Sequence, residues 1–197
     1  MFNRAQFVAI AFCALACSKP PAQSSPAPSA NPVPTVTPPP PAARTPPMQS
    51  LTATATLRDL AGATSGAVKF TDSRAGVLIT GTITGMGLGW HGVHIHAVGK
   101  CEPPFATAGG HLNPESKKHG YLSADGPHLG DLPNVDTPPS GPIHFEFLLA
   151  DVSLKGRNAL LDADGAAIVV HSGRDDYATD PAGNSGARMA CGVIVTP

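Results

Sequence analysis

The feature that most limits how this chain can fold is an abrupt change in composition near residue 50. All 14 acidic residues and 10 of the 13 basic residues lie after this point, whereas more than half of the 22 prolines lie before it. An almost uncharged, proline-rich segment cannot bury enough apolar surface to fold. Residues 50–197 therefore form one domain of ordinary size, long enough for a hydrophobic core. Its 10 basic and 14 acidic residues give a formal charge of −4, which argues against a nucleic-acid partner.

Residues 1–17 have the layout of an export signal. Arg4 gives a positive start, and residues 7–16 form a short apolar run that is too short to span a bilayer as a helix. Residues 14–17, Ala-Leu-Ala-Cys, resemble a bacterial lipobox, in which the cysteine is acylated and becomes the mature N-terminus. Ala14 stands where leucine is usual in that pattern. The alternative is an ordinary cleaved signal peptide with an incidental Cys17.

Residues 18–49 separate this signal from the domain. They are mostly Pro, Ala, Ser and Thr with almost no charge, so we expect them to stay extended and disordered. They are either a spacer without a role or a stalk that holds the domain away from a membrane. Because a stalk suits a lipid tether, we favour a lipoprotein exported to the periplasm or cell envelope and anchored through Cys17.

Two of the four cysteines lie in the domain at residues 50–197. Cys13 would leave with the signal and Cys17 is the candidate lipidation site, which leaves Cys101 and Cys191. An even number of cysteines in an exported domain favours a disulfide over two buried free thiols. Such a bond would close a loop of roughly 90 residues and contribute about 4–5 kcal/mol through loop-closure entropy.

Short β-strands are the dominant pattern after residue 50, without strong helical periodicity. Alternating or apolar runs are separated by Gly, Pro and Asp. The expected strands are 51–60, 66–71, 77–84, 92–98, 143–152, 166–171 and 189–196. The turn at 72–76 should join the second and third strands as a hairpin.

Two long irregular stretches, 99–142 and 172–188, interrupt this series of strands. Loops of this length in a compact domain are usually functional. The sequence therefore predicts an all-β fold, a sandwich or barrel with two long functional loops.

All eight histidines lie in this domain, and two of them share an expected strand. His94 and His96 are two residues apart, so their side chains lie on one face, while His91 points to the other. An isolated His-x-His pair is a weak metal signal, because an exposed or hydrogen-bonded pair is commoner.

The first long loop strengthens the metal interpretation. It carries His111, His119, His128 and Asp131 within 21 residues that are rich in Gly and Pro, and His171 ends a later strand. Imidazole suits copper and zinc, and a carboxylate oxygen completes a tetrahedral zinc site. A bound ion could also order an irregular loop.

Taken in chain order, these segments resemble copper–zinc superoxide dismutase, and most of all its exported bacterial members. The resemblance covers roughly residues 50–197 and is specific because the short pieces occur together. It implies a Greek-key β-barrel of eight strands that disproportionates superoxide to oxygen and hydrogen peroxide. The segments are His91-Gly-Val-His-Ile-His, Ala108-Gly-Gly-His-Leu-Asn-Pro, Lys118-His-Gly, His128-Leu-Gly-Asp-Leu-Pro-Asn, Val170-His and Gly183-Asn-Ser-Gly-Ala-Arg-Met-Ala-Cys-Gly-Val-Ile.

The resemblance also implies one copper and one zinc ion per subunit. The implied copper ligands are His94, His96, His111 and His171. The implied zinc ligands are His111, His119, His128 and Asp131. In this scheme His111 bridges the two metals and hands a proton to the substrate during the redox cycle.

Further roles follow from the same resemblance. Asp175 matches an outer carboxylate that links a copper-binding histidine to a zinc-binding one. Arg188 matches an arginine beside the copper that attracts superoxide. Cys101 and Cys191 match a disulfide that holds the metal-binding loop near Arg188.

Some residues match no ligand or depart from the family pattern. We interpret His91 and His144 as structural. Trp90 either packs at a subunit interface or covers the strand end, and we favour the second. Ala97 replaces an acidic residue, and residues 172–188 lack the steering lysines of some relatives, for which Lys100 is a candidate substitute. These departures concern substrate steering and the contact of a homodimer, which the resemblance leaves open.

A second hypothesis is a non-catalytic copper- and zinc-binding envelope protein on the same barrel. The ligand set alone does not separate it from an enzyme. Arg188 favours the enzyme, because a metal store has no need of an arginine that attracts anions.

Overall fold

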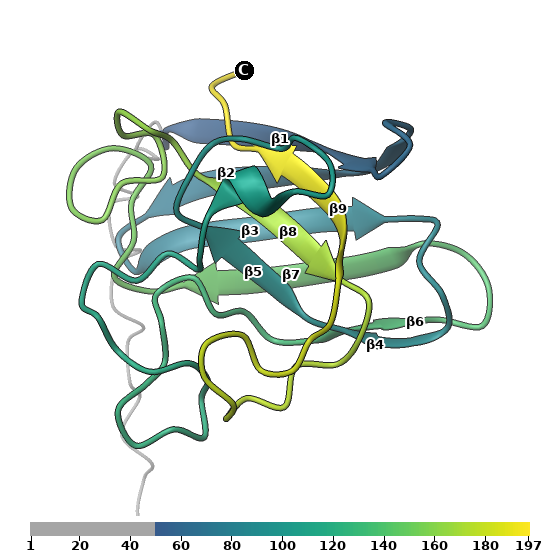
Figure 1. Cartoon of the computed structure of the whole chain (residues 1–197). Coiled ribbons are helices and arrows are strands. Elements are labelled where there is room, and N and C mark those ends of the chain that lie inside the picture. The colour runs from purple at the N-terminus through teal and green to yellow at the C-terminus, as the bar shows by residue number, and fades with distance from the viewer. Residues whose placement is uncertain (1–49) are drawn as a thin grey trace, which may run out of the picture. The chain divides into compact units, whose positions relative to one another are not determined.

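The computed structural model describes residues 50–197 (Figure 1), so the expectations for the signal, the linker and Cys17 lie outside the described residues. The described part contains nine strands and one short 3-10 helix, Ala106–Ala108. The strands are β1 (Thr52–Asp59), β2 (Thr64–Ser73), β3 (Gly76–Ile83), β4 (Gly89–His91), β5 (Val93–His96), β6 (Val135–Thr137), β7 (Ile143–Leu149), β8 (Ala167–His171) and β9 (Arg188–Val193).

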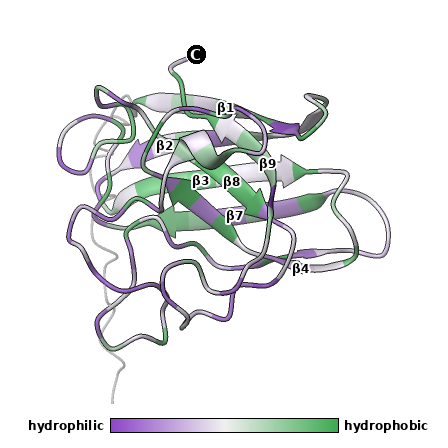
Figure 2. Ribbon diagram, viewed as in Figure 1, coloured by the Kyte–Doolittle hydropathy of each residue, from purple (hydrophilic) through white to green (hydrophobic). Residues whose placement is uncertain are grey.

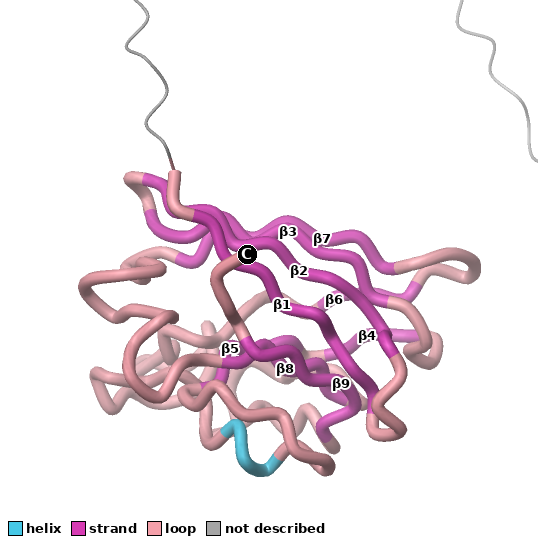
Figure 3. Tube along the Cα trace, turned by 90° about the horizontal axis from the view of Figure 1, so that it is seen from above, coloured by secondary structure: helices cyan, strands magenta, loops and turns pink. Residues whose placement is uncertain are grey.

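Seven strands form one antiparallel sheet in the order β5-β8-β9-β1-β2-β3-β7, and β4 pairs with β6 in a second sheet. The large sheet curls, so that β1, β2, β3 and β7 lie opposite β5, β8 and β9 (Figure 3). The all-β barrel prediction is confirmed. Only Gly92 separates β4 from β5, so counting these two as one interrupted strand gives the expected eight.

Alternation along the strands explains how they form the core. In β1, Ala53, Ala55 and Leu57 are buried, whereas Thr54 and Thr56 are exposed. The period of two places every second side chain inside the barrel. Hydrophobic residues accordingly concentrate on the strands and polar ones on the loops (Figure 2).

The strand β5 is buried on both faces, one of which is apolar while the other carries histidines. Val93 and Ile95 belong to the hydrophobic core. His94 and His96 are fully buried and point to the other side. Since β5 pairs with β8 in register, the backbone that presents these two histidines is fixed by a ladder of hydrogen bonds.

The two long loops cover this histidine face. They span residues 97–134 and 172–187, and the part of the first loop that follows the 3-10 helix lies with the second loop in the lower part of Figure 1. The backbone N–H of Leu122 donates to the carbonyl of Tyr177 at 2.9 Å, which joins the two loops. A Cβ on Gly120 would overlap the carbonyl group of Tyr177, so only glycine permits this approach.

A disulfide joins Cys101 to Cys191, with the two Cα atoms 5.6 Å apart. This confirms the expected pairing. It attaches the first loop to β9 beside a small second core that contains Phe105, Ala108 and Val169. Among residues 50–197 there is no helix with the length and hydropathy needed to cross a membrane.

The disulfide should contribute strongly to stability, because it links positions 90 residues apart and restricts the unfolded chain. We expect the double variant Cys101→Ser, Cys191→Ser to lose about 4 kcal/mol of unfolding free energy in the metal-free state. Denaturant titration monitored by circular dichroism measures this loss. Equal midpoints for the variant and the oxidised wild-type protein would contradict it.

Candidate metal centre

Four histidines converge between β5, β8 and the first loop. His94 and His96 come from β5, His171 is the last residue of β8, and His111 comes from the loop. Each offers one ring nitrogen, and these four atoms lie within 4.8 Å of one another. All four rings are buried, so the nitrogens converge on a point shielded from water.

Three of these rings are oriented by an outer hydrogen bond. A ring nitrogen that donates a hydrogen fixes the tautomer and leaves the opposite nitrogen with a free lone pair. The contacts are His94 Nε2 to Asp175 Oδ2 at 2.6 Å, His96 Nδ1 to the Gly109 carbonyl at 2.9 Å, and His171 Nδ1 to the Gly186 carbonyl at 3.2 Å.

The inner nitrogens of the same cluster are buried and have no hydrogen-bond partner within the described residues. Leaving a buried polar atom unpaired costs about 1–3 kcal/mol, so four such atoms aimed at one point are costly unless an ion binds them. Four imidazole nitrogens suit copper well. The atoms are His94 Nδ1, His96 Nε2, His111 Nε2 and His171 Nε2.

A second cluster surrounds Asp131 in the first loop. Its Oδ1 lies 2.8 Å from His111 Nδ1, 3.0 Å from His119 Nδ1 and 3.3 Å from His128 Nδ1. The other oxygen, Oδ2, accepts the backbone N–H groups of Gly120 at 2.8 Å and His128 at 3.0 Å. Three imidazoles and one carboxylate are a common donor set for tetrahedral zinc. His111 faces both clusters, one with each ring nitrogen.

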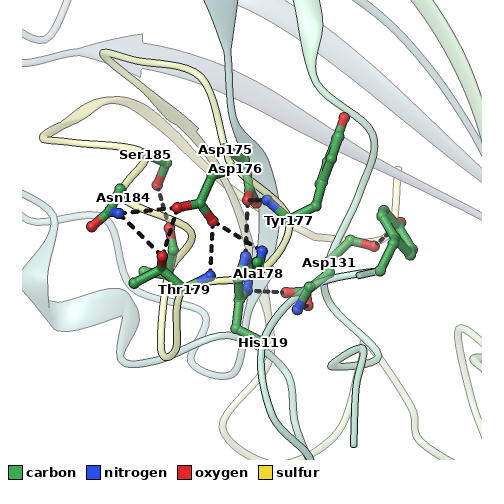
Figure 4. A network of polar contacts seen from close by, with 12 residues as sticks. His119, Asp131, Asp175, Asp176, Tyr177, Ala178, Thr179, Asn184 and Ser185 are labelled. Carbon is green, nitrogen blue, oxygen red and sulfur yellow. Dashed lines mark hydrogen bonds and ion pairs between the residues drawn. The ribbon is translucent and has the colours of Figure 1, made fainter. Parts of the chain in front are cut away.

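Asp175 connects the two clusters from outside, and Figure 4 shows its contact with His119 of the second cluster. Its carboxylate accepts His94 Nε2 at 2.6 Å and His119 Nε2 at 3.0 Å, and all three side chains are fully buried. The side chain of Asn134 clamps the backbone of Asp175, donating to its carbonyl at 2.9 Å and accepting its N–H at 2.8 Å. A Cβ on Gly183 would overlap the Asp175 carboxylate, so this position must be glycine.

In the first cluster, formed by His94, His96, His111 and His171, burial favours the neutral form of the imidazole rings. Burial lowers the pKa of His94, and it lowers the pKa of His96 to about 2 and that of His171 to about 3. Burial also lowers the pKa of His111 to about 4, although its hydrogen bond to Asp131 acts in the opposite direction. Near neutral pH the inner nitrogens therefore hold lone pairs.

The second cluster behaves differently because it contains charge. Burial would lower the pKa of His119, but its hydrogen bonds to Asp131 and Asp175 outweigh this and raise the pKa to about 9. Burial would raise the pKa of both carboxyls, yet hydrogen bonds from the histidines hold each below its usual range. Two ionised carboxylates beside His119 thus create a place for a cation.

A pocket of about 480 Å³ leads to the clusters, and Arg188 lies in its wall with His111 and His171. The register of β8 and β9 places Arg188 opposite His171. Its guanidinium donates to the carbonyls of Phe105 and Gly109, both at 2.6 Å, so the charge is held in place. Burial lowers the pKa of Arg188, but a guanidinium stays protonated.

The same pocket contains two charged residues that the sequence interpretation missed, Lys117 and Asp180. Lys117 pairs with Glu115 at 2.9 Å on the exposed rim. Lys100, the candidate substitute, is not among the residues that line this pocket. Lys117 lies in the sequence between the expected ligands His111 and His119, and this position could have indicated that it lies near the site. A larger hollow of about 620 Å³ on the outer sheet face contains neither cluster.

The remaining histidines lie outside the clusters, as expected. The ring nitrogens of His91 contact the carbonyls of His171 at 2.8 Å and Gly87 at 2.9 Å. His144 is exposed and contacts the Thr82 hydroxyl at 3.2 Å. Trp90 is half exposed, with the guanidinium of Arg174 5.8 Å from its ring centroid.

Comparison with known proteins agrees with this geometry. The sequence model of the family described as copper/zinc superoxide dismutase matches residues 64–194. The chain is 44% identical to copper–zinc superoxide dismutase 2 of Aquifex aeolicus over 150 residues, which cover 74% of this chain and 88% of that protein. It is 44% identical to the copper–zinc enzyme of Caulobacter vibrioides over 148 residues, 73% and 85% of the two chains. The chain therefore belongs to the copper/zinc superoxide dismutase family.

Solved structures support the same fold. A double mutant of a superoxide-dismutase-like protein from Bacillus subtilis superposes with a TM-score of 0.70 and 38% identity, covering 72% of this chain and 96% of that one. A protein titled clock protein EA4 superposes with a TM-score of 0.64 and 32% identity, covering 76% and 97%. The barrel is thus shared by proteins with different names, and the side chains must distinguish their functions.

The carboxylate of Asp131 should be essential for the second cluster. We expect Asp131→Ala to lose zinc and to lower the melting temperature, because three buried imidazoles lose their common partner. Copper binding should largely survive, because Asp131 contributes no atom to the first cluster. Metal analysis and calorimetry of the purified variant test this, and unchanged zinc content would refute the assignment.

Proposed function

We propose that this chain disproportionates superoxide to oxygen and hydrogen peroxide with one copper and one zinc ion per subunit. The proposed copper ligands are His94, His96, His111 and His171. The proposed zinc ligands are His111, His119, His128 and Asp131. The observation that carries the proposal is a set of four buried imidazole nitrogens that point to one place and have no hydrogen-bond partner among the described residues. One of these rings, His111, also belongs to the second cluster.

A copper ion held by the four histidines of the first cluster would supply the one-electron redox chemistry that this reaction needs, and a zinc ion would be redox-inert. The second superoxide also needs two protons to become hydrogen peroxide. His111 is placed to carry one of them at Nε2, the atom that faces the first cluster. Its Nδ1 stays in the second cluster, 2.8 Å from Asp131, so the ring keeps its position while the proton moves.

Attraction of the anionic substrate depends on local charge. The formal charge of residues 50–197 is −4, so the mean field of the domain repels superoxide. Arg188 and Lys117 place positive charge at the pocket. Two of the five N–H groups of Arg188 are used by Phe105 and Gly109, which leaves the others for substrate.

The non-catalytic metal-binding protein is the alternative, and one relative is named only as superoxide-dismutase-like. A store needs the ligand sets but neither an open pocket nor a guanidinium beside them. Here Arg188 is fixed in the wall of the pocket that reaches His111 and His171, which favours the enzyme.

Substitutions of Arg188 separate these two functions. At about 5 Å and an effective dielectric near 20, one charge attracts an anion by roughly 3 kcal/mol before screening. Water and salt reduce this, so we expect Arg188→Ala to lower the second-order rate about tenfold. Arg188→Glu should lower it further, and Arg188→Lys should fall between wild type and Ala because it keeps charge without the planar fork.

Pulse radiolysis at several ionic strengths measures these rates, after metal content has been shown to be equal across the series. Salt should slow the wild type and affect Arg188→Glu less or in the opposite sense, because charges are screened over about 10 Å at 0.1 M. Equal rates for fully metallated variants would remove the steering role. Bound copper and zinc without any turnover in the wild type would favour the metal-binding alternative.

We also propose that the protein is exported, lipid-anchored through Cys17 and able to form a homodimer, and that it protects the cell envelope. The lipobox-like residues 14–17 and the proline-rich segment that follows support the anchor.

Acylation is tested directly on the precursor. The wild-type protein should incorporate labelled fatty acid and sediment with membranes, whereas Cys17→Ala should do neither, because its thiol attachment point is gone. Mature wild-type protein that is fully soluble and unlabelled would leave an ordinary signal peptide as the explanation.

A further inference from the structure

Asp180 belongs to the second loop, and its carboxylate lies next to the second cluster, the group of residues around Asp131. Its Oδ1 accepts the backbone N–H of His119 at 2.9 Å, and its Oδ2 pairs with Lys118 Nζ at 3.1 Å. The same Oδ1 lies 3.9 Å from His128 Nε2. Asp180 is 40% exposed and lines the active-site pocket, whereas the side chain of His128 is only 6% exposed.

The outer nitrogens of the three histidines in this cluster show why that contact matters. All three present Nδ1 to Asp131, so each turns Nε2 outward. His111 Nε2 faces the first cluster, and His119 Nε2 is bound to Asp175 at 3.0 Å. His128 Nε2 is left, and within residues 50–197 the carboxylate oxygen within 4.0 Å of it is Asp180 Oδ1.

The charge of Asp180 also needs an explanation. A carboxylate in the wall of a pocket that takes an anion works against substrate entry, although Lys118 offsets part of its charge. Metal-binding histidines usually donate their other N–H to a carboxylate, a carbonyl or water, and this raises their basicity. Attraction of the substrate does not explain a carboxylate at this position, whereas orientation of His128 does.

We propose that Asp180 is a second positioning carboxylate of the zinc cluster, acting on His128 as Asp175 acts on His119. A separation of 3.9 Å is too long for a direct hydrogen bond, but a shift of about 1 Å, or one bridging water, closes it. Because Asp180 also binds the backbone of His119, one side chain of the second loop fixes two zinc-side histidines. This inference rests on the proposed zinc site.

The test compares Asp180→Ala, Asp180→Asn and the control Asp125→Asn. Asp125 is an exposed carboxylate of the first loop whose side chain has no partner among residues 50–197, so the control removes equal charge without touching the cluster. Metal-free proteins are titrated with zinc against a chromophoric chelator, and with Co(II) as a visible probe of the same site. Copper affinity is measured in parallel to show that each variant is folded.

We expect Asp180→Ala to weaken zinc binding about 10- to 100-fold and to alter the Co(II) spectrum, because His128 loses its outer acceptor. Asp180→Asn should show a smaller loss, since its amide oxygen can still accept the backbone N–H of His119 and stay beside His128 Nε2. Asp125→Asn and the copper affinities should match wild type.

Zinc affinity of Asp180→Ala within twofold of wild type would overturn the proposal, and so would an equal loss in Asp125→Asn. If Asp180→Ala does not fold, the Asp180→Asn protein decides, and a Co(II) spectrum and zinc affinity identical to wild type would overturn the proposal. Failure of the wild-type protein to bind zinc at all would instead refute the zinc site on which the proposal rests.

Discussion

The carboxylate of Asp175 lies between two imidazoles in a position that excludes water, and the geometry of both clusters depends on it. Burying an ionised carboxylate costs several kcal/mol unless hydrogen bonds and charge repay it. Asp175 accepts from His94, His119 and the backbone of Tyr177, which satisfies it. Because the two rings donate Nε2, each turns Nδ1 inward, one to each cluster. A single buried charge therefore sets the tautomer of one histidine at each metal.

Some of the proposed ligands come from the strands of the barrel and the others come from irregular loops. The barrel supplies His94, His96 and His171 from strands whose positions follow from their pairing, whereas the loop ligands lie on backbone without a regular ladder. Isolated bridges hold His111 against His96 and Asp131 against His94 of β5, and further contacts within and between the loops add to them. Asn134 clamps Asp175, Gly183 leaves room for its carboxylate, and the disulfide fixes the loop whose carbonyls hold Arg188. Sites held this way can present several donors to one point within a small tolerance.

The period of two in a strand was enough to predict that His94 and His96 share a face, and turn residues located most strands. Family resemblance placed the loop histidines and Asp131 in the same two groups that lie together in the structure. The strands β4 and β6 were missed because three residues carry too little alternation. Asp180 and Lys117 were missed for a different reason. The bond between His119 and Asp180 joins positions 61 residues apart, and the path of two irregular loops has no period from which such a contact can be inferred.

The central claim is that the two clusters bind different metals and share His111. Anomalous diffraction from crystals of the protein loaded with both metals, recorded on either side of the copper and zinc absorption edges, tests it most directly. The account predicts a copper peak among His94, His96, His111 and His171, and a separate zinc peak among His111, His119, His128 and Asp131. Copper at the Asp131 cluster, a single shared peak, or metal outside both clusters would contradict it.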